Sequence, residues 1–520
     1  MSKQSERLLI QLGEIRAETV EEADEFIPKP TGKRPTWKRW AAMAAGLAII
    51  LFTAGVFSGV IPFLRLGGNS GGAGVNPQGG GPSTFMSYAG PVFPLTMRDE
   101  NDSITAQRDI TLDFAPWVPV TGNGYQRYST DILVTDAYTL TNVSEEEKTV
   151  RVLYPFSGAL YELAKRTPAL TADGAELDTT LHAGGYSGGF QGADGGRSEP
   201  LLNLDHLHSW EEYKALLSDG RYQAAALGEY PDLSGVPVTV YRFFDYYGPE
   251  PDEKAGYPNP SIQAEFELDY GRTTVLSYGF HAAGYDRENG TMIQGFSIPR
   301  PYNPWYGDSY YLFVVGDDIQ NLTTGAYVTG GADADTKKLD GAGVSVERYT
   351  FDLESALHMA AELMYGRRER LQESGADFEM YFGLLKEYLC FYGVLSEKPV
   401  ERYFAGWLED LEVDAVERVF YLEAEVAIPA GGSVRLAAEM TKEGSYDFYC
   451  AHTENQNIYG YDFVTELGSN LTCTGQRAAI EDRGLIEIVR QNFGFDLKNG
   501  VKSVDLDPTQ EHYYLEVRGR

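Results

Sequence analysis

The feature that most constrains this chain is a run of 25 residues without a charge, from Trp40 to Leu64. At about 1.5 Å of rise per residue, a helix of this length crosses a hydrocarbon core of about 30 Å with some tilt. Five Lys or Arg side chains lie within residues 29–39, and Arg65 is the only charge close behind the run. Because cytoplasmic flanks carry the excess of Lys and Arg, the sequence predicts a single-pass cell-membrane protein, with its N-terminus cytoplasmic and the residues after Arg65 extracytoplasmic.

A cleaved signal peptide is the main alternative for this run. Signal peptides have a short basic segment, an apolar core of roughly 7–15 residues and small residues at the cleavage site. Here 39 residues precede the apolar run, which is longer and ends in Ile61-Pro62-Phe63-Leu64. These lengths favour an uncleaved anchor over 40–64, and a buried globular helix is a weaker third interpretation.

The charge balance limits the partners of this protein. The chain has 43 basic and 76 acidic side chains, a net charge of -33. Phosphate backbones are bound by basic faces, so no nucleic-acid partner is expected. Residues 1–39 hold eight of the basic and seven of the acidic side chains, so the predicted exterior is strongly acidic. Such a surface favours solubility, and it also favours cations or basic ligands.

The inner tail, residues 1–39, is predicted to contain a short amphipathic helix over 5–26. Apolar residues recur there at near-helical spacing among acidic ones, and Pro28 and Pro30 end the pattern. A short helix of this kind is marginal in water unless its apolar face is covered. Docking of a cytoplasmic protein on 5–26 is one interpretation, and a tail held only by the lipid bilayer is the other. The apolar positions are Leu8, Leu12, Ile15, Val20 and Ala23.

The exterior is predicted to be mainly β. A Gly-rich linker over 65–84 leads into a β-rich region over 85–350, a helical block over 351–412 and a C-terminal β-rich region over 413–520. Alternation of apolar and polar residues around polar turns is typical of antiparallel sheets that bury one face. The fold class that we expect is α+β, an antiparallel β-sandwich with a helical insertion and one transmembrane helix.

Three segments carry this alternation on both sides of a turn, which is the signal of a β-hairpin. They span 131–154, 262–280 and 418–440, and in the last every second residue is apolar over 422–428 and 434–440. The first and last segments are either the edges of two sandwiches or parts of one sandwich that the middle of the chain interrupts. Further short strands are expected at 309–315, 345–351 and 513–518.

Helices are expected at two places in the exterior. Ser209 and Glu212 match a capping box, and Gly220 is expected to end that helix. In the block over 351–412, helices are predicted from Phe351 to about Gly375, from Asp377 and from Ser396. Their apolar stripes predict core packing. The stripes consist of Leu353, Leu357, Ala360 and Met364, then Phe382, Leu385 and Leu389, and then Tyr403, Phe404, Trp407, Leu408 and Leu411.

The tail and span together resemble a group of uncharacterised single-pass surface proteins of Gram-positive bacteria, some of them anti-sigma-factor-like. The resemblance covers about 65 residues and is carried by Leu12-Gly13-Glu14-Ile15, Val20-Glu21-Glu22-Ala23, Lys33-Arg34 and Trp37-Lys38-Arg39-Trp40. It implies an inner segment that holds a sigma factor and an exterior that senses a signal. Residues 1–39 contain neither His nor Cys, so the zinc-binding pattern of many anti-sigma domains is absent from this tail.

One pentapeptide, Gly185 to Gly189, matches the G-x-S-x-G motif, in which Ser187 would be the nucleophile. A nucleophile elbow needs a strand before the Ser and a helix after it. The residues that follow, 190–200, are Gly-rich and not helical in pattern. A loop is therefore the preferred interpretation.

Two patterns could supply metal ligands. His206 and His208, preceded by Asp205, lack a third His or Cys nearby, so a polar loop is preferred over a zinc site. The second pattern falls at i, i+4 and i+8 of a predicted helix, where a solvated face is the usual explanation. It consists of Glu354, His358 and Glu362.

Several acidic turns are further candidates for metal sites, in this case for calcium. Asp333 and Asp335 begin like an EF-hand loop, but Lys337 and Lys338 occupy the next ligand and Gly positions and exclude it. Two other pairs of aspartates lie in apparent turns, Asp317 with Asp318 and Asp505 with Asp507. For both pairs, a role in forming the turn is preferred over a calcium site.

The three cysteines are too few for a disulfide scaffold. Cys450 and Cys473 are separated by 22 residues, and a bridge between them would stabilise the fold by about 3 kcal/mol. The sequence alone does not decide whether Cys450 and Cys473 form this disulfide. Cys390 is expected to be a buried thiol beside a helical stripe.

Three classes of function are compatible with these patterns. The preferred one is a membrane-anchored extracytoplasmic binding or sensing protein, because strong topology signals accompany weak catalytic ones. The alternatives are a surface hydrolase acting on an envelope or carbohydrate substrate, and a structural or adhesive envelope protein. No catalytic residue, metal site or cofactor is assigned from the sequence.

Overall fold

The computed structural model describes residues 89–520 except for 100, 118, 123–124, 129, 187–213, 215–216, 219, 300–309, 331–336, 398–406, 412, 447–454, 456 and 508. The predicted tail, span and linker, residues 1–84, therefore lie outside the described residues. None of the helices in the described part has both the length and the apolar character needed to span a bilayer. The described part is mainly β with several sheets, as the sequence predicts.

Four long strands form the centre of the fold: β6 (Ile132–Asn142), β7 (Lys148–Gly158), β19 (Arg418–Ile428) and β20 (Ser433–Lys442). The predicted hairpins at 131–154 and 418–440 are wrong, although the strands themselves are present. β6 pairs with β20 in one sheet and β7 pairs with β19 in another, all antiparallel. Each strand-turn-strand unit therefore crosses from one sheet to the other, and the two units pair with each other.

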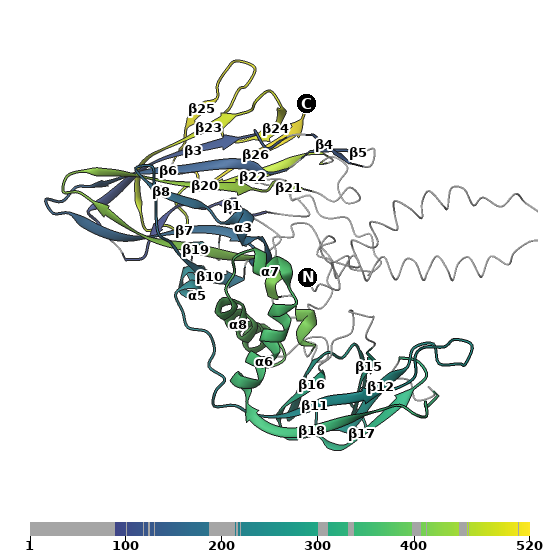
Figure 1. The fold of residues 1–520 in the computed structure, drawn as a ribbon. Helices are drawn as coiled ribbons and strands as arrows, with labels where there is room; N and C mark the ends of the chain where they lie inside the picture. The colour runs from purple at the N-terminus through teal and green to yellow at the C-terminus, as the bar shows by residue number, and fades with distance from the viewer. Residues whose placement is uncertain are drawn as a thin grey trace, which may run out of the picture.

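The two sheets share one apolar core that alternate residues of all four strands enter, among them Tyr138, Tyr154, Leu422 and Leu436. We call the sheet that contains β6 and β20 the long sheet, and the sheet that contains β7 and β19 the short sheet (Figure 1). The long sheet has the order β25 (Ser503–Asp505), β23 (Thr472–Glu481), β3 (Ile104–Asp113), β6, β20, β8 (Ala169–Ala172) and β9 (Ala175–Glu176). The short sheet has the order β10 (Thr180–Tyr186), β19, β7 and β2 (Thr96–Met97).

A third sheet joins the start and the end of the described chain. In this sheet β1 runs parallel to β22, and β22 pairs antiparallel with β26. Strand β26 confirms the strand predicted at 513–518. Its order is β1 (Pro91–Val92), β22 (Tyr459–Val464), β26 (His512–Gly519) and β24 (Ile486–Gln491), with β21 (Ser445–Tyr446) on β22. A separate pair consists of β4 (Pro119–Gly122) and β5 (Tyr125–Tyr128).

The middle of the chain forms two more sheets, which pack on each other. The inner one has the order β13 (Thr273–Tyr278), β16 (Tyr310–Gly316), β11 (Pro237–Tyr247) and β18 (Gly343–Asp352). The outer one has the order β14 (Ala282–Asp286), β15 (Thr291–Ser297), β12 (Ser261–Glu267) and β17 (Gln320–Tyr327). The strands predicted at 309–315 and 345–351 are confirmed as β16 and β18.

The predicted hairpin at 262–280 is also wrong, because β12 and β13 lie in different sheets. Within the inner sheet, β13 and β16 are buried on both faces, which explains their continuous apolar sequences, whereas no residue of the edge strand β18 is fully buried. In β16, Leu312 and Val314 enter the core shared with the outer sheet, whereas Tyr311 and Phe313 face the larger core that contains the helices.

The helical block lies between the inner sheet and the central strands (Figure 1). Asp352 and Asp377 accept backbone hydrogen bonds at the starts of two helices, which begin where the sequence predicts. The first helix ends earlier than predicted, at Gly366. The described elements are α6 (Leu353–Gly366), α7 (Glu369–Glu373), α8 (Phe378–Glu387), a π turn (Tyr388–Tyr392) and two short 3-10 turns (Leu408–Leu411 and Val413–Ala415).

The predicted stripes on α6 and α8 are buried, which confirms their core role. Most of the third predicted helix, from Ser396, lies outside the described residues. Lys214, Leu217 and Ser218 are helical, and Gly220 follows them with the positive φ of 69° that favours Gly, as predicted for the end of that helix. Gly220 also precedes a further helix, α5 (Arg221–Ala226), whereas Ser209 and Glu212 lie outside the described residues. Two further short helical turns span Leu160–Glu162 (η1) and Leu163–Arg166 (α3).

Candidate functional site

The larger of two described hollows lies between β10, the edge strand of the short sheet, and α8. Its volume is about 340 Å³. We call it the helix cleft. It is lined by Leu181, His182 and Ala183 of β10, by Ala225, Ala226, Gly228 and Tyr230 of α5 and the loop behind it, by Glu354 of α6, and by Asp377, Glu379, Met380, Phe382, Gly383 and Lys386 at and along α8.

One wall of the helix cleft depends on a glycine inside α8. A Cβ atom at Gly383 would lie 2.3 Å from Cδ2 of Tyr230, far inside contact distance. Glycine in a helix interior costs about 1 kcal/mol relative to Ala, so its presence is explained by the close approach of the Tyr230 ring. The ring closes one side of the cleft while the residue stays 39 % exposed.

Lys386 is the single Lys or Arg side chain among the residues that line the cleft, and it is neutralised locally. Its Nζ lies 2.5 Å from Oε1 of Glu354 and 4.7 Å from the centre of the Phe382 ring. The other oxygen of Glu354 accepts a hydrogen bond from the backbone N–H of Leu233. An ammonium group is thus held between a carboxylate and an aromatic face at the inner end of α8.

His182 forms the opposite rim. Its Nε2 lies 2.8 Å from Oε2 of Glu423 on the neighbouring strand β19. Both oxygens of Glu423 also accept hydrogen bonds from Arg98, which lower the pKa of this carboxyl although burial opposes them. These contacts fix the His182 ring at the edge of the cleft.

A fully buried arginine lies behind the cleft, between β10 and α8. Nη1 of Arg418 donates to the carbonyl oxygen of Gly184 and lies 2.9 Å from Oε2 of Glu387. Its Nε and Nη2 have no hydrogen-bond partner within the described part of the chain. Burial raises the pKa of the Tyr230 hydroxyl to about 12, an effect that Arg418 opposes and that Glu387 and Asp377 increase.

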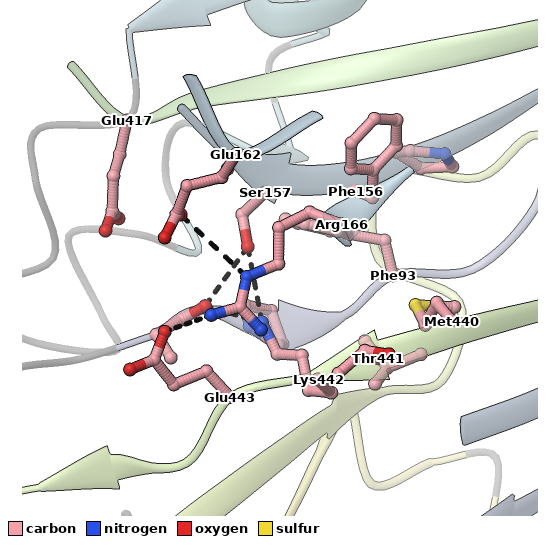
Figure 2. Close-up of a pocket in the computed structure, with 15 residues that line it drawn as sticks. Phe93, Phe156, Ser157, Glu162, Arg166, Glu417, Met440, Thr441, Lys442 and Glu443 are labelled. Carbon is pink, nitrogen blue, oxygen red and sulfur yellow. Dashed lines mark hydrogen bonds and ion pairs between the residues drawn. The ribbon is translucent and has the colours of Figure 1, made fainter. Parts of the chain in front are cut away.

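The smaller hollow, which we call the charged pocket, lies where the chain enters the described fold at Ala89. Figure 2 shows Arg166 reaching between the carboxylates of Glu162 and Glu443. Nζ of Lys442 donates to the carbonyl oxygen of Ala89. The volume of this pocket is about 30 Å³, which leaves room for no more than a few water molecules.

Burial controls the ionisation of the charged pocket. It raises the pKa of Glu417 to about 7, and the nearby carboxylates of Glu162 and Glu443 add to this effect. It lowers the pKa of Lys442 to about 8, helped by the charge of Arg166. Perturbed groups of this kind occur both in catalytic sites and in structural networks. Here they surround a space of about 30 Å³, too small for most substrates, which favours the structural role.

The structure explains one of the glycines of the G-x-S-x-G match. A Cβ atom at Gly185 would lie 3.0 Å from the ring of Tyr222 on α5, so the glycine is needed for the close packing of α5 on β10. Ser187 lies outside the described residues, as do His206, His208 and Asp205.

The second predicted metal pattern does not converge. Glu354 pairs with Lys386, whereas Nδ1 of His358 lies 3.7 Å from Oε1 of Glu362. The His358 ring packs against the rings of Phe378 and Phe382. Across the described ranges, no group of three or more His, Cys, Asp or Glu side chains is arranged to hold a metal ion.

The acidic turns have ordinary structural roles where they are described. Asp317 pairs with Arg272, and Asp318 pairs with Arg348 and accepts a hydrogen bond from Tyr241. Asp507 accepts hydrogen bonds from the N–H and hydroxyl of Thr509, and Asp505 lies in β25. Asp333 and Asp335 lie outside the described residues.

Two of the three cysteines are described, and both are free thiols. Cys473 lies in β23, and burial raises the pKa of its thiol to about 11. Its suggested partner, Cys450, lies outside the described residues. Cys390 is partly buried, and burial raises its pKa also to about 11, which keeps both thiols protonated near neutral pH.

The residues that make up the helix cleft could not be grouped from the sequence. The sequence patterns include only three of its residues: Asp377 as a helix start, Phe382 as part of an apolar stripe and Glu354 in the possible metal pattern. Tyr230, Glu379 and Lys386 carry no motif, and they come together through the packing of α8 beside β10. Comparison with models of known protein families and with curated proteins gives no match, so the helix cleft has to be interpreted from its own chemistry.

Proposed function

We propose that this chain is a single-pass membrane protein whose extracytoplasmic part binds or senses a small ligand in the helix cleft. The volume of about 340 Å³ carries the binding part of the proposal, because ligand sites typically measure about 300–1,000 Å³. Apolar surface from Met380 and Phe382 together with a few convergent polar groups is typical of such sites. The apolar run over 40–64 and its basic flank support the anchor.

The inner tail supports a regulatory role within the same proposal. The amphipathic pattern over 5–26 offers an apolar face to a cytoplasmic protein, and the resemblance to anti-sigma-like tails points to a sigma factor as that partner. Ligand occupancy outside would then change the assembly or release of the inner partner.

The hydrolase alternative is less well supported. The carboxyl groups with raised pKa values around Glu417 face the charged pocket, whose 30 Å³ do not admit a sugar ring or a peptide. The adhesive alternative needs a broad apolar patch. The large exposed apolar side chains in the described part are instead spread over several elements, including Leu133 in β6, Tyr247 in β11 and Phe391 in the π turn.

The anchor is tested by adding protease to intact cells. We expect release of a soluble fragment that begins within 66–84, while residues 1–39 stay protected inside. A mature N-terminus after position 50 in untreated cells would show cleavage by a signal peptidase and would contradict the anchor.

The binding function is tested by filling the cleft. Ala225→Trp places an indole in the helix cleft, whereas Ala224→Trp, at the exposed neighbouring position of α5, does not line it. We expect ligands found by thermal-shift screening of the full-length chain to lose affinity in Ala225→Trp and to keep it in Ala224→Trp. Equal affinity of both variants for every ligand would contradict binding in the cleft.

A further inference from the structure

We infer that the ligand of the helix cleft is a small organic cation, with its ammonium group between Asp377, Glu379 and Tyr230 and its apolar body against Met380 and Phe382. This inference rests on the binding function proposed above and names the ligand class. It is carried by the charges that line the cleft, by an ammonium group that the protein itself already holds there, and by the aromatic ring that closes one wall.

The first step concerns charge. Of the lining side chains, Lys386 and Glu354 cancel each other, and His182 is engaged by Glu423. The carboxylates of Asp377 and Glu379 remain. They lie at the start of α8, where the helix supplies the equivalent of about half a positive charge. Half a charge offsets only part of two carboxylates, so the cleft keeps a net negative charge that favours a cation.

The second step concerns Asp377 itself. Its Oδ1 accepts the backbone N–H of Met380 as a helix cap, which fixes the direction of the carboxylate and leaves Oδ2 available to a ligand. Asp377 and Tyr230 line the same cleft. Aromatic faces attract ammonium ligands, and a carboxylate in the same cleft adds opposite charge.

The third step concerns an ammonium group that the protein itself places in the cleft. The ammonium of Lys386 lies between the carboxylate of Glu354 and the face of Phe382 in this same cleft. The protein thus already places one largely buried primary ammonium group in this cleft beside a carboxylate and an aromatic ring. Asp377, Glu379 and Tyr230 repeat the combination of carboxylate and aromatic ring nearer the start of α8, where no lining residue supplies the cation.

The size of the cleft narrows the ligand further. A volume of about 340 Å³ is near the lower limit for ligand sites and suits a small amine or one lysine side chain. A free amine and the lysine of a peptide share the recognised group. The experiment therefore includes both sources.

The test is calorimetric titration of the full-length chain in detergent with phenethylamine, its neutral analogue phenethyl alcohol and the anion hydrocinnamate. We expect phenethylamine to bind at least about tenfold more tightly than the other two, since two charge contacts of modest strength together amount to about that factor. Nα-acetyl-lysine amide, titrated in parallel, separates the two sources. Preference for it indicates a peptide side chain, and preference for phenethylamine indicates a free amine.

Matched variants assign the binding to the named carboxylates. Asp377→Asn with Glu379→Gln keeps the helix cap and removes both charges, and we expect the affinity for phenethylamine to fall about tenfold. Glu373→Gln removes an exposed carboxylate from α7, outside the cleft, and should leave the affinity within about twofold. Unchanged affinity in the double variant would overturn the inference.

Two further outcomes separate this inference from the proposed function. If phenethyl alcohol or hydrocinnamate binds as tightly as the amine and Ala225→Trp abolishes that binding, the cleft is a ligand site but not a cation site. If Ala225→Trp leaves the binding of all the compounds unchanged, both the ligand class and the proposed binding function in the cleft are overturned.

Discussion

Arg108 and Asp136 form an ion pair with two hydrogen bonds, of 2.8 and 2.7 Å, in which both side chains are fully buried. They lie on the neighbouring strands β3 and β6, in the core of the long sheet. The carboxylate of Asp136 also accepts hydrogen bonds from the hydroxyls of Tyr138 and Tyr154. The remaining donors of Arg108 are taken by the carbonyl oxygens of Phe93, Val464 and Thr465.

Removing one partner of this pair is expected to be costly. Asp136→Asn leaves the charge of Arg108 buried without compensation, and we expect a loss of about 3–5 kcal/mol in the free energy of unfolding. The measurement is urea denaturation of the full-length chain. Asp109→Asn, in the neighbouring strand β3, removes an exposed pair with Arg477 and should cost less than about 1 kcal/mol. Similar losses in both variants would contradict the importance of the buried pair.

A second prediction concerns the glycine under Tyr230. Gly383→Ala should lower the melting temperature although Ala favours a helix by about 1 kcal/mol, because its Cβ would lie 2.3 Å from the Tyr230 ring. Gly366→Ala, at the end of α6 with no atom within 4 Å, is the control and should be neutral or stabilising.

The double variant shows whether the ring is the cause. With Tyr230→Ala in place, Gly383→Ala should become stabilising, since only the gain in helix propensity remains. Destabilisation that persists without the ring would show that Gly383 is required for another reason.

The third prediction concerns pH. The pKa of Glu417 is about 7 in the folded chain, against an ordinary value of 4.5, so the folded state binds the proton more tightly than the unfolded state. The stability that this proton contributes is complete below about pH 4.5 and is lost as the pH rises through about 7. Burial raises the pKa of Glu409 to about 7 as well, so the two carboxyls act in the same direction.

Glu417→Gln replaces the carboxyl by a neutral group of the same shape. We expect the decline in melting temperature between about pH 5 and pH 8 to become smaller, with the remainder due to other buried carboxyls, among them Glu409 and Asp410, whose pKa burial raises to about 6. Glu425→Gln, at an exposed position of β19, is the control and should leave the decline unchanged. A decline of the same size in Glu417→Gln would contradict the assignment to Glu417.

The fourth prediction concerns the predicted linker over 65–84. A flexible Gly-rich segment transmits force poorly, so signalling is expected to work through assembly, cleavage or release. Insertion of about ten Gly and Ser residues should leave the response almost unchanged, since doubling a flexible loop costs only about 0.6 kcal/mol. Loss of the response at normal surface expression would indicate tight mechanical coupling.

Strands were predictable from the sequence, but their partners were not. The alternation from Leu422 to Ile428 identifies a strand with one buried face, and it is present as β19. The same alternation is compatible with a hairpin and with a strand that crosses to a facing sheet, because both need a polar turn. The partners of β19 are β7 and β10, both far away in the sequence, and no local pattern encodes that choice.

The helix cleft was even less accessible to sequence analysis. Asp377 is recognisable as a helix cap, and this prediction is confirmed. The approach of Tyr230 to Gly383 depends on the packing of a loop against a helix about 150 residues later. The motifs that the sequence does contain, at Ser187 and at His206, fall outside the described residues.

The pairing of β6 with β20 and of β7 with β19 imposes an order on folding during synthesis. The inner and outer sheets, from β11 to β18, contain all their own strand partners, so they can form as soon as this part of the chain has been synthesised. The central strands cannot, because β6 and β7 each have one edge that stays unpaired until the chain has been made as far as Lys442. Exposed edges of that kind recruit other chains. The newly made protein is therefore most vulnerable to aggregation while its middle is already folded and the segment that holds β19 and β20, residues 418–442, has yet to be made.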